Sequence, residues 1–333
     1  MVIAAIGVAL VFAMTNGLHD SANAIATLVA TRALRPGAAV CLAAAGNIVG
    51  PLVFGKAVAD TVAGIVTVPS SALIVVLGAA VTGAASWNIL TWSRGFPSSS
   101  SHALLGGLVG ATIAQAGVHG VHWGGFRGFH AEGVFGVVAV LALAPLIGFT
   151  TGFVTERAAR RATRRATQRA RGPVRVAQVV MAGALAFSHG ANDAQKTIGV
   201  VTLVLLAGGE IHKLSPPAWA VVACGAALTT GTALGGWPIV RTIGRRIVRL
   251  RPIDSLASQT ASTIVLLSAS LIGAPVSTTQ VVASSVVGVG AGRRRWRHVH
   301  WPIVRNMLLA WLVTVPAAAA LSVAALVPWR WFA

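Results

Sequence analysis

Acidic residues are scarce in this sequence: Asp and Glu together number seven among 333 residues, and charged residues of both signs make up only 10%. A soluble domain carries about 25% charged residues. Several apolar runs approach the roughly 20 residues that a helix needs to cross a bilayer. These runs are continuous rather than alternating, which disfavours membrane-spanning strands. The composition therefore excludes an ordinary soluble domain and predicts an all-α polytopic membrane protein.

Cysteine is almost absent as well. The two cysteines, Cys41 and Cys224, both lie in apolar runs. Neither a disulfide framework nor a metal-ligand spacing is present in such a pair, and both residues are expected to be small buried side chains. The sequence thus predicts no resident cofactor and no metal site.

Basic residues, in contrast, are abundant and give a formal net charge of +19. Most of them lie in three short segments, with eight between Arg157 and Arg175, five between Arg241 and Arg251, and five between Arg293 and Arg305. Basic clusters between apolar spans mark the cytoplasmic side of a membrane and contact anionic lipid head groups. This distribution argues for lipid contact and against a nucleic-acid partner.

Two stretches place polar side chains inside apolar sequence. Residues 16–25 contain His19, Asp20 and Asn23, and residues 188–199 contain Asn192, Asp193 and Lys196. One offset of 173 residues aligns Gly17 with Gly190 and Asp20 with Asp193. A charge at membrane depth is unfavourable and marks a functional site. Because the first stretch interrupts the apolar run of residues 3–31, we expect a broken helix there.

A second pair of segments repeats in the same order. Pro97 is followed by four serines, and Pro275 by Val276, Ser277, Thr278 and Thr279, at an offset of 178. Further landmarks match collinearly, Gly50 with Gly231 and His122-Trp123 with His300-Trp301. These matches predict an internal duplication, with repeats over residues 1–155 and 176–333 joined by a basic linker over residues 156–175.

The basic clusters also predict how the repeats are oriented. Residues 156–175 and 293–297 are expected on the cytoplasmic side, whereas the matching loop of the first half, residues 117–133, carries only Arg127 and Glu132 as charges. Corresponding loops on opposite faces indicate inverted-topology repeats with both termini extracytoplasmic. Residues 72–116 and 255–290 are interpreted as re-entrant hairpins, which gives about 10–12 membrane helices in all.

The hydroxyl-rich segments suit an anion. Helix N-termini direct free N–H groups towards a negative charge, and hydroxyls after a proline add neutral donors. The candidate phosphate-binding residues are Ser99, Ser100, Ser101, Ser277, Thr278 and Thr279. The alternative is ordinary N-capping of two helices. Asp20 and Asp193, at matched positions, are candidates for a coupling-ion or proton site.

These doubled motifs, together with the stretch from Thr230 to Trp237, resemble the inorganic phosphate transporter (PiT) family, and most closely its bacterial low-affinity branch. The resemblance implies secondary import of phosphate through inverted repeats. It also implies that Asp20, Asn23, Asn192 and Asp193 form the coupling site, while the six hydroxyl residues hold phosphate.

Two residues depart from the family pattern, which has Asn at the positions of His19 and Lys196. An amide oxygen suits Na⁺, but an ammonium offers donors only, and a histidine titrates near physiological pH. We therefore add His19 and Lys196 to the coupling site and favour proton over sodium symport. A divalent metal as co-substrate, in a metal–phosphate complex, is left open, as is a homo-oligomer.

Two alternatives accompany this prediction. One is a symporter for another tetrahedral oxyanion such as sulfate. The other is an intramembrane hydrolase using Asp20, His102 and Ser99, which is disfavoured because Gln280 replaces His102 in the second repeat and a triad requires one asymmetric set. The sequence contains no G-x-x-x-x-G-K-[ST] loop for ATP. The prediction is a carrier of the cell inner membrane rather than an enzyme.

Overall fold

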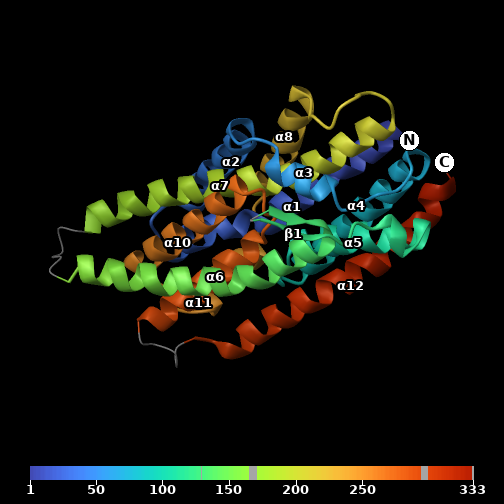
Figure 1. Ribbon diagram of the computed structural model, residues 1–333. Helices are drawn as coiled ribbons and strands as arrows, with labels where there is room; N and C mark the ends of the chain where they lie inside the picture. The colour runs from blue at the N-terminus through green and yellow to red at the C-terminus, as the bar shows by residue number, and fades with distance from the viewer. Residues whose placement is uncertain (129, 165–170, 294–298, 332–333) are drawn as a thin grey trace.

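The computed structural model describes residues 1–128, 130–164, 171–293 and 299–331, and the chain is almost entirely helical over these ranges (Figure 1). The first half contains α1 (Val2–Ala30), α2 (Pro36–Val53), α3 (Ala57–Ala63), α4 (Ser70–Ser93), α5 (Ser100–Ala116) and α6 (Gly133–Ala162). The second half contains α7 (Arg171–Ala207), α8 (Ala218–Leu234), α9 (Trp237–Arg241), α10 (Pro252–Leu271), α11 (Thr278–Gly292) and α12 (Trp301–Trp331). Three short elements, η1 (Val118–Gly120), β1 (Gly125–Arg127) and β2 (His130–Glu132), lie between α5 and α6, and a π-helical turn, η3 (Thr242–Arg246), follows α9.

Five of the described helices, α1, α2, α4, α6 and α12, are long and apolar enough to cross a membrane. The number rises to six if α8 and the bent segment after it, which turns by 61°, count as one span. Helix α7 has 37 residues but carries the polar stretch around Asp193. These lengths confirm the prediction of an all-helical, multi-pass membrane protein.

The two halves repeat the same order of elements and pack reciprocally. Helix α1 packs on α8 and α7 packs on α2; likewise α6 packs on α10 and α11, while α12 packs on α4 and α5. Each of these contacts between the halves thus has a counterpart in which the two halves exchange roles. This is the arrangement expected of a structural duplication.

Glycines allow the motif helices to approach their partners at backbone contact. A Cβ atom added at Gly231 of α8 would lie 1.9 Å from the carbonyl oxygen of Met14 in α1, and one added at Gly50 of α2 would lie 2.4 Å from that of Phe187 in α7. Small residues at helix interfaces are the usual means of close packing in membranes. Helices α1 and α7, which carry the polar motifs, are therefore held tightly by the opposite half.

The hairpins α4–α5 and α10–α11 enter from opposite ends of the bundle, and their tips meet inside it (Figure 1). At the meeting point the Ser101 hydroxyl donates to the carbonyl oxygen of Val276 at 2.9 Å. The N- and C-termini lie at one end of the molecule, and the ends of α6 and α11 lie at the other. The tips of both hairpins thus reach the middle of the protein, and re-entrance of their arms stays a prediction.

The expected break in residues 3–31 is wrong, because α1 is one continuous helix from Val2 to Ala30. The side chains of His19, Asp20 and Asn23 bind groups on other elements while the backbone stays helical. The breaks occur instead between the hairpin arms, where Pro97 and Pro275 lie, as expected because proline has no N–H to donate.

Helix extends into the basic linker from both sides. Helix α6 continues to Ala162 and α7 begins at Arg171, so helix covers much of the segment assigned to residues 156–175. Arg165, Arg169 and residues 294–297 of the basic clusters lie outside the described residues. The proposed repeat boundaries stay a prediction.

Candidate functional site

Four side chains of α1 and four of α7 share one spacing. Asn16, His19, Asp20 and Asn23 lie at positions i, i+3, i+4 and i+7, which share one face of a helix, and the same spacing recurs on α7. The residues on α7 are His189, Asn192, Asp193 and Lys196. All eight are at most 2% exposed. The two polar faces both point at the hairpin tips.

Asp20 binds hydroxyls from both hairpins. Its Oδ2 accepts from Ser100 Oγ at 2.7 Å, and its Oδ1 accepts from Thr279 Oγ1 at 2.5 Å. Ser100 begins α5, whereas Thr279 lies in the first turn of α11. One carboxylate of the first repeat therefore connects the two tips.

Asp193 binds the second tip in a corresponding way. Thr278 Oγ1 lies 3.0 Å from Asp193 Oδ2 and 3.4 Å from Asp20 Oδ2. A hydroxyl has one proton to donate, so Thr278 binds one carboxylate at a time. This residue is the direct link between the two aspartates.

Lys196 is enclosed by acceptors. Its Nζ donates to Asp193 Oδ1, to Ser101 Oγ at 2.7 Å and to the carbonyl oxygen of Val276 at 2.8 Å. An ammonium has three protons, and each has an acceptor here. The side chain is 1% exposed, so its charge is balanced within the protein rather than by water.

Each aspartate has a histidine beside it, but at different positions of the repeat. His19 Nδ1 lies 3.1 Å from Asp20 Oδ1, and its Nε2 lies 3.1 Å from Ser98 Oγ. His189 Nε2 lies 2.8 Å from Asp193 Oδ2, while its Nδ1 pairs with Asn47 Oδ1 at 2.8 Å. Neither His189 nor Asn47 was predicted from the sequence as a site residue. The four-residue spacing between His189 and Asp193 was the available signal.

Two amide oxygens of the predicted coupling site remain without a protein donor. Asn23 Nδ2 donates to Thr279 Oγ1 at 3.2 Å, and Asn192 Nδ2 donates to the carbonyl oxygen of Ala274 at 3.1 Å. The Oδ1 atoms of both residues are buried and unpaired among the described residues. Burying such an oxygen is unfavourable unless it gains a partner, so both are available to a cation or another donor.

Ser99 and Ser277 act as N-caps. Ser99 Oγ accepts from the His102 N–H at 3.2 Å and contacts His102 Nδ1 at 2.7 Å, and Ser277 Oγ accepts from the Gln280 N–H at 3.3 Å. The other four hydroxyls face the carboxylates, the amide of Asn23 and Lys196. The alternative of N-capping thus describes the first hydroxyl of each tip, and a part of all six in phosphate binding stays a prediction.

Little free volume borders the site. The cavity beside Ser101 and Lys196 has a volume of about 10 Å³, which is at the lower limit for a single water molecule. A cavity of this size is too small for an oxyanion.

One group of side chains has the chemistry of a metal site. Single ligand atoms of Asp20, His189 and Asp193 all lie within 4.8 Å of one another, and all three residues are buried. Carboxylate oxygens and an imidazole nitrogen suit a divalent transition metal. The sequence predicted no metal site because Asp20 lies on α1 and is far in the sequence from His189 and Asp193 of α7.

Fold and site together define a class: a helical membrane protein in which two repeats share one polar site between hairpin tips. A family model described as "Phosphate transporter family" matches residues 16–171 and, separately, residues 155–322. The chain belongs to this phosphate transporter family, which confirms the resemblance found in the sequence.

Curated relatives extend over nearly the whole chain. A protein of Rhizobium meliloti (strain 1021) is 40% identical over 97% of this chain and 94% of its own length. One of Bacillus subtilis (strain 168) is 35% identical over 94% and 92%. Both are named "Probable low-affinity inorganic phosphate transporter". These names agree with the prediction that the chain is not an enzyme.

A solved structure has the same fold. It is titled "The sodium-dependent phosphate transporter", is 22% identical, and superposes with a TM-score of 0.86 over 100% of this chain and 99% of its own. At this level of identity the likeness concerns the fold alone.

Proposed function

We propose that this protein imports inorganic phosphate by symport with protons, and that phosphate binds where the two hairpin tips meet. The observation that carries the proposal is that hydroxyls of both tips, Ser100 and Thr278, bind two buried carboxylates. When the tips separate, the same hydroxyls become donors to phosphate oxygens, and the carboxylates become acceptors for phosphate O–H groups.

Charge balance makes a co-transported cation necessary. Lys196 already neutralises Asp193, whereas the ion-pair partner of Asp20 among the described residues is His19, which carries a charge only when protonated. An anion next to an ionised, buried Asp20 would be strongly repelled. Phosphate therefore binds when a cation neutralises this carboxylate, and that requirement couples the two fluxes.

A proton suits this task better than sodium. In the second repeat the Lys196 ammonium lies against Asp193, where the family pattern would offer an amide to Na⁺. In the first repeat His19 lies next to Asp20 and is linked through Ser98 to Thr91, whose hydroxyl is 2.8 Å from that of Ser98. A proton needs one acceptor oxygen and can be shared along such a chain. The related solved structure is titled as sodium-dependent. Sodium is therefore the cation against which proton coupling is to be tested.

A second candidate is transport of phosphate as a complex with a divalent metal. The observation that favours it is the proximity of Asp20, His189 and Asp193. A divalent cation held there would neutralise the carboxylates and bind a phosphate oxygen at the same time, so that metal and phosphate would cross together as substrate.

Sulfate is a less suitable substrate for this site. Asp193, which is paired with Lys196, is an acceptor, and phosphate at neutral pH retains a proton that sulfate lacks. The site can therefore recognise phosphate by accepting a hydrogen bond, and sulfate would leave that acceptor facing a negative oxygen. Excess sulfate is expected to leave phosphate uptake unchanged.

The test is uptake of labelled phosphate by the purified protein in liposomes under imposed gradients. A pH gradient alone should drive accumulation. Accumulation that follows a sodium gradient and ignores pH would overturn proton coupling. A strict need for divalent metal, with the metal accumulating in equal amount, would favour the second candidate.

We further propose that the basic end of the bundle, at the end of α6 and the start of α7, faces the cytoplasm, and that both termini lie outside. Arginine clusters at that end support this orientation. A cysteine placed at Thr163 should react with an impermeant thiol reagent only from the inside in right-side-out vesicles, with Cys41 replaced by Ser.

A further inference from the structure

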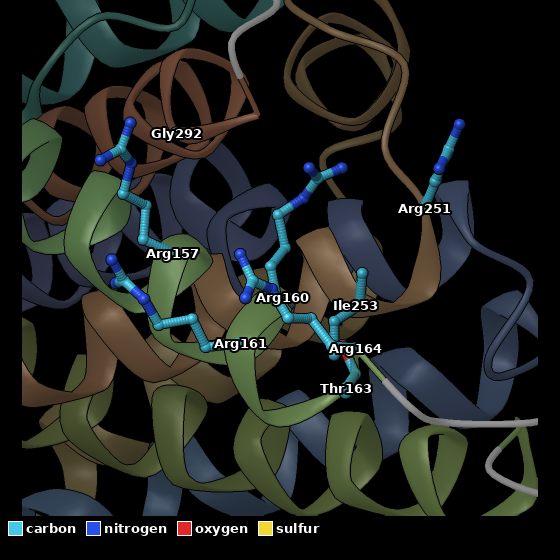
Figure 2. Close-up of a pocket in the computed structure, with 8 residues that line it drawn as sticks. All are labelled: Arg157, Arg160, Arg161, Thr163, Arg164, Arg251, Ile253 and Gly292. Atoms are coloured by element: carbon cyan, nitrogen blue, oxygen red, sulfur yellow. The ribbon is translucent and has the colours of Figure 1, made fainter.

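Arginines from two segments converge on a hollow at the basic end of the molecule. The hollow has a volume of about 590 Å³. It is lined by Arg157, Arg160, Arg161 and Arg164 of α6 and its end, by Arg251 before α10, and by Thr163, Ile253 and Gly292. Figure 2 shows Arg157 and Arg161 on one side of this hollow and Arg251 on the other.

A second hollow of about 740 Å³ adjoins the first and shares Thr163, Arg251 and Ile253 with it. It adds Arg32 after α1, and Arg171 and Arg175 of α7. Among the described residues, no acidic side chain lines either hollow. We call the two together the arginine basin.

Nearby acidic residues neutralise little of this charge. Glu156 pairs with Arg160 at 3.0 Å, and Asp254 pairs with Arg293, which is outside the lining. Both acids are fully buried beneath the basin. Most of the lining guanidinium groups therefore keep their positive charge facing the hollow.

Some of these arginines are held in place before any ligand binds. The Arg157 guanidinium lies over the Phe153 ring, 4.9 Å from its centre, and Arg175 Nε donates to the carbonyl oxygen of Ala33 at 2.7 Å. A side chain that is already positioned loses less entropy when it binds an anion. Membrane orientation explains why arginines lie at this end, but it does not require them to surround a common hollow.

We propose that the arginine basin binds an anion carrying several clustered phosphate groups, at a site separate from the transport pathway. Guanidinium groups bind phosphate through paired N–H donors. A single phosphate would contact few of the arginines, whereas clustered phosphates would contact arginines of α6, α7 and the segment before α10 together. Two sources share this chemistry: the head group of an anionic lipid with two phosphates, and a soluble chain of linked phosphates. Binding would connect α6 and α7, the last helix of one repeat and the first of the next.

The experiment measures binding apart from transport, so its result does not depend on the proposed function. The full-length protein in detergent is titrated with inorganic tripolyphosphate by calorimetry. In parallel, the protein is placed in nanodiscs with and without cardiolipin, and retained lipid is counted by native mass spectrometry.

The variant Arg161→Gln/Arg164→Gln removes two exposed arginines of the basin. The matched control is Arg35→Gln/Arg305→Gln, which removes two exposed arginines that do not line it. The basin variant should bind at least tenfold more weakly, and the control should change less than twofold. Phosphate uptake without added polyanion should be the same in both.

Binding of tripolyphosphate alone would support the soluble source, selective retention of cardiolipin alone would support the lipid source, and both together would support a basin open to either. Absence of both, or an equal loss in the control variant, would overturn the proposal.

Discussion

Asn23 and Lys196 occupy matched positions of the two repeats, and each donates to the matched hydroxyl of the opposite hairpin. Asn23 Nδ2 lies 3.2 Å from Thr279 Oγ1, and Lys196 Nζ lies 2.7 Å from Ser101 Oγ. The same contact is thus present in both repeats. The donor differs, because it is a neutral amide in one repeat and a cation in the other. This asymmetry leads to the first prediction.

Replacing Lys196 with Asn should make the second repeat resemble the first. Asp193 would lose its buried counter-ion, an effect that typically destabilises a protein by about 3–5 kcal/mol. A free cation could then take its place. We expect a lower thermal unfolding temperature that sodium chloride restores more than choline chloride does, together with loss of uptake driven by pH alone. Sodium-independent stability in this variant would contradict the assignment of Lys196 as a built-in cation.

Asp20→Asn removes the carboxylate whose charge is proposed to require the proton. The amide has nearly the same shape and keeps an acceptor oxygen for Ser100 or Thr279. Accumulation against a gradient should fall at least tenfold, whereas exchange of labelled for unlabelled phosphate should persist, because binding no longer needs a proton. The surface variant Asp60→Asn, which loses only an exposed pair with Lys56, is the control. A loss of exchange equal to the loss of accumulation would argue against this role.

Thr278 is the hydroxyl between the two aspartates, and Thr278→Val should weaken phosphate binding. A lost hydrogen bond to a charged group is worth about 1.5–3 kcal/mol, or roughly ten- to a hundredfold in affinity. Thr278→Ser should bind nearly normally because it keeps the hydroxyl. Thr260→Val serves for comparison, since Thr260 donates only to the Leu256 carbonyl of its own helix. Equal affinities for the Val and Ser variants would remove Thr278 from the binding site.

His189 distinguishes the two candidate functions. If metal and phosphate cross together, His189→Gln should weaken binding of Mn²⁺ or Co²⁺ at least tenfold in calorimetry and reduce metal-dependent uptake in parallel. Asn47→Leu removes the partner of His189 Nδ1 and should have a smaller effect in the same direction. If transport is of phosphate with protons alone, uptake in metal-free buffer should continue in the parent protein.

Gly231→Ala tests the close packing that holds α1 against α8. The added Cβ would lie 1.9 Å from the Met14 carbonyl oxygen, whereas a Cβ added at Gly37 would have nothing within 4 Å. Backbone on both sides leaves no flexible side chain to move aside. Gly231→Ala should lower the unfolding temperature and the yield of folded protein in detergent, and Gly37→Ala should change neither.

The sequence predicted the parts of the site that occur twice. Asp20, Asp193 and the hydroxyl segments repeat at constant offsets, and the structure brings them together. Asn47 could not be found this way, because the position 181 residues later is Leu228, and nothing in a single copy links Asn47 to His189. The break expected within α1 was wrong for a related reason. A polar residue in an apolar run shows only that it needs a partner, and it does not show whether the backbone or another element supplies one.

Because helices of the first half pack on helices of the second, the packing of the first half can be completed only after the second half has been made. Helices α4 and α5 pack on α12, which is made later in the second half of the chain, and α6 packs on α10 and α11. The first half therefore emerges with surfaces that have no cover until the second half is inserted.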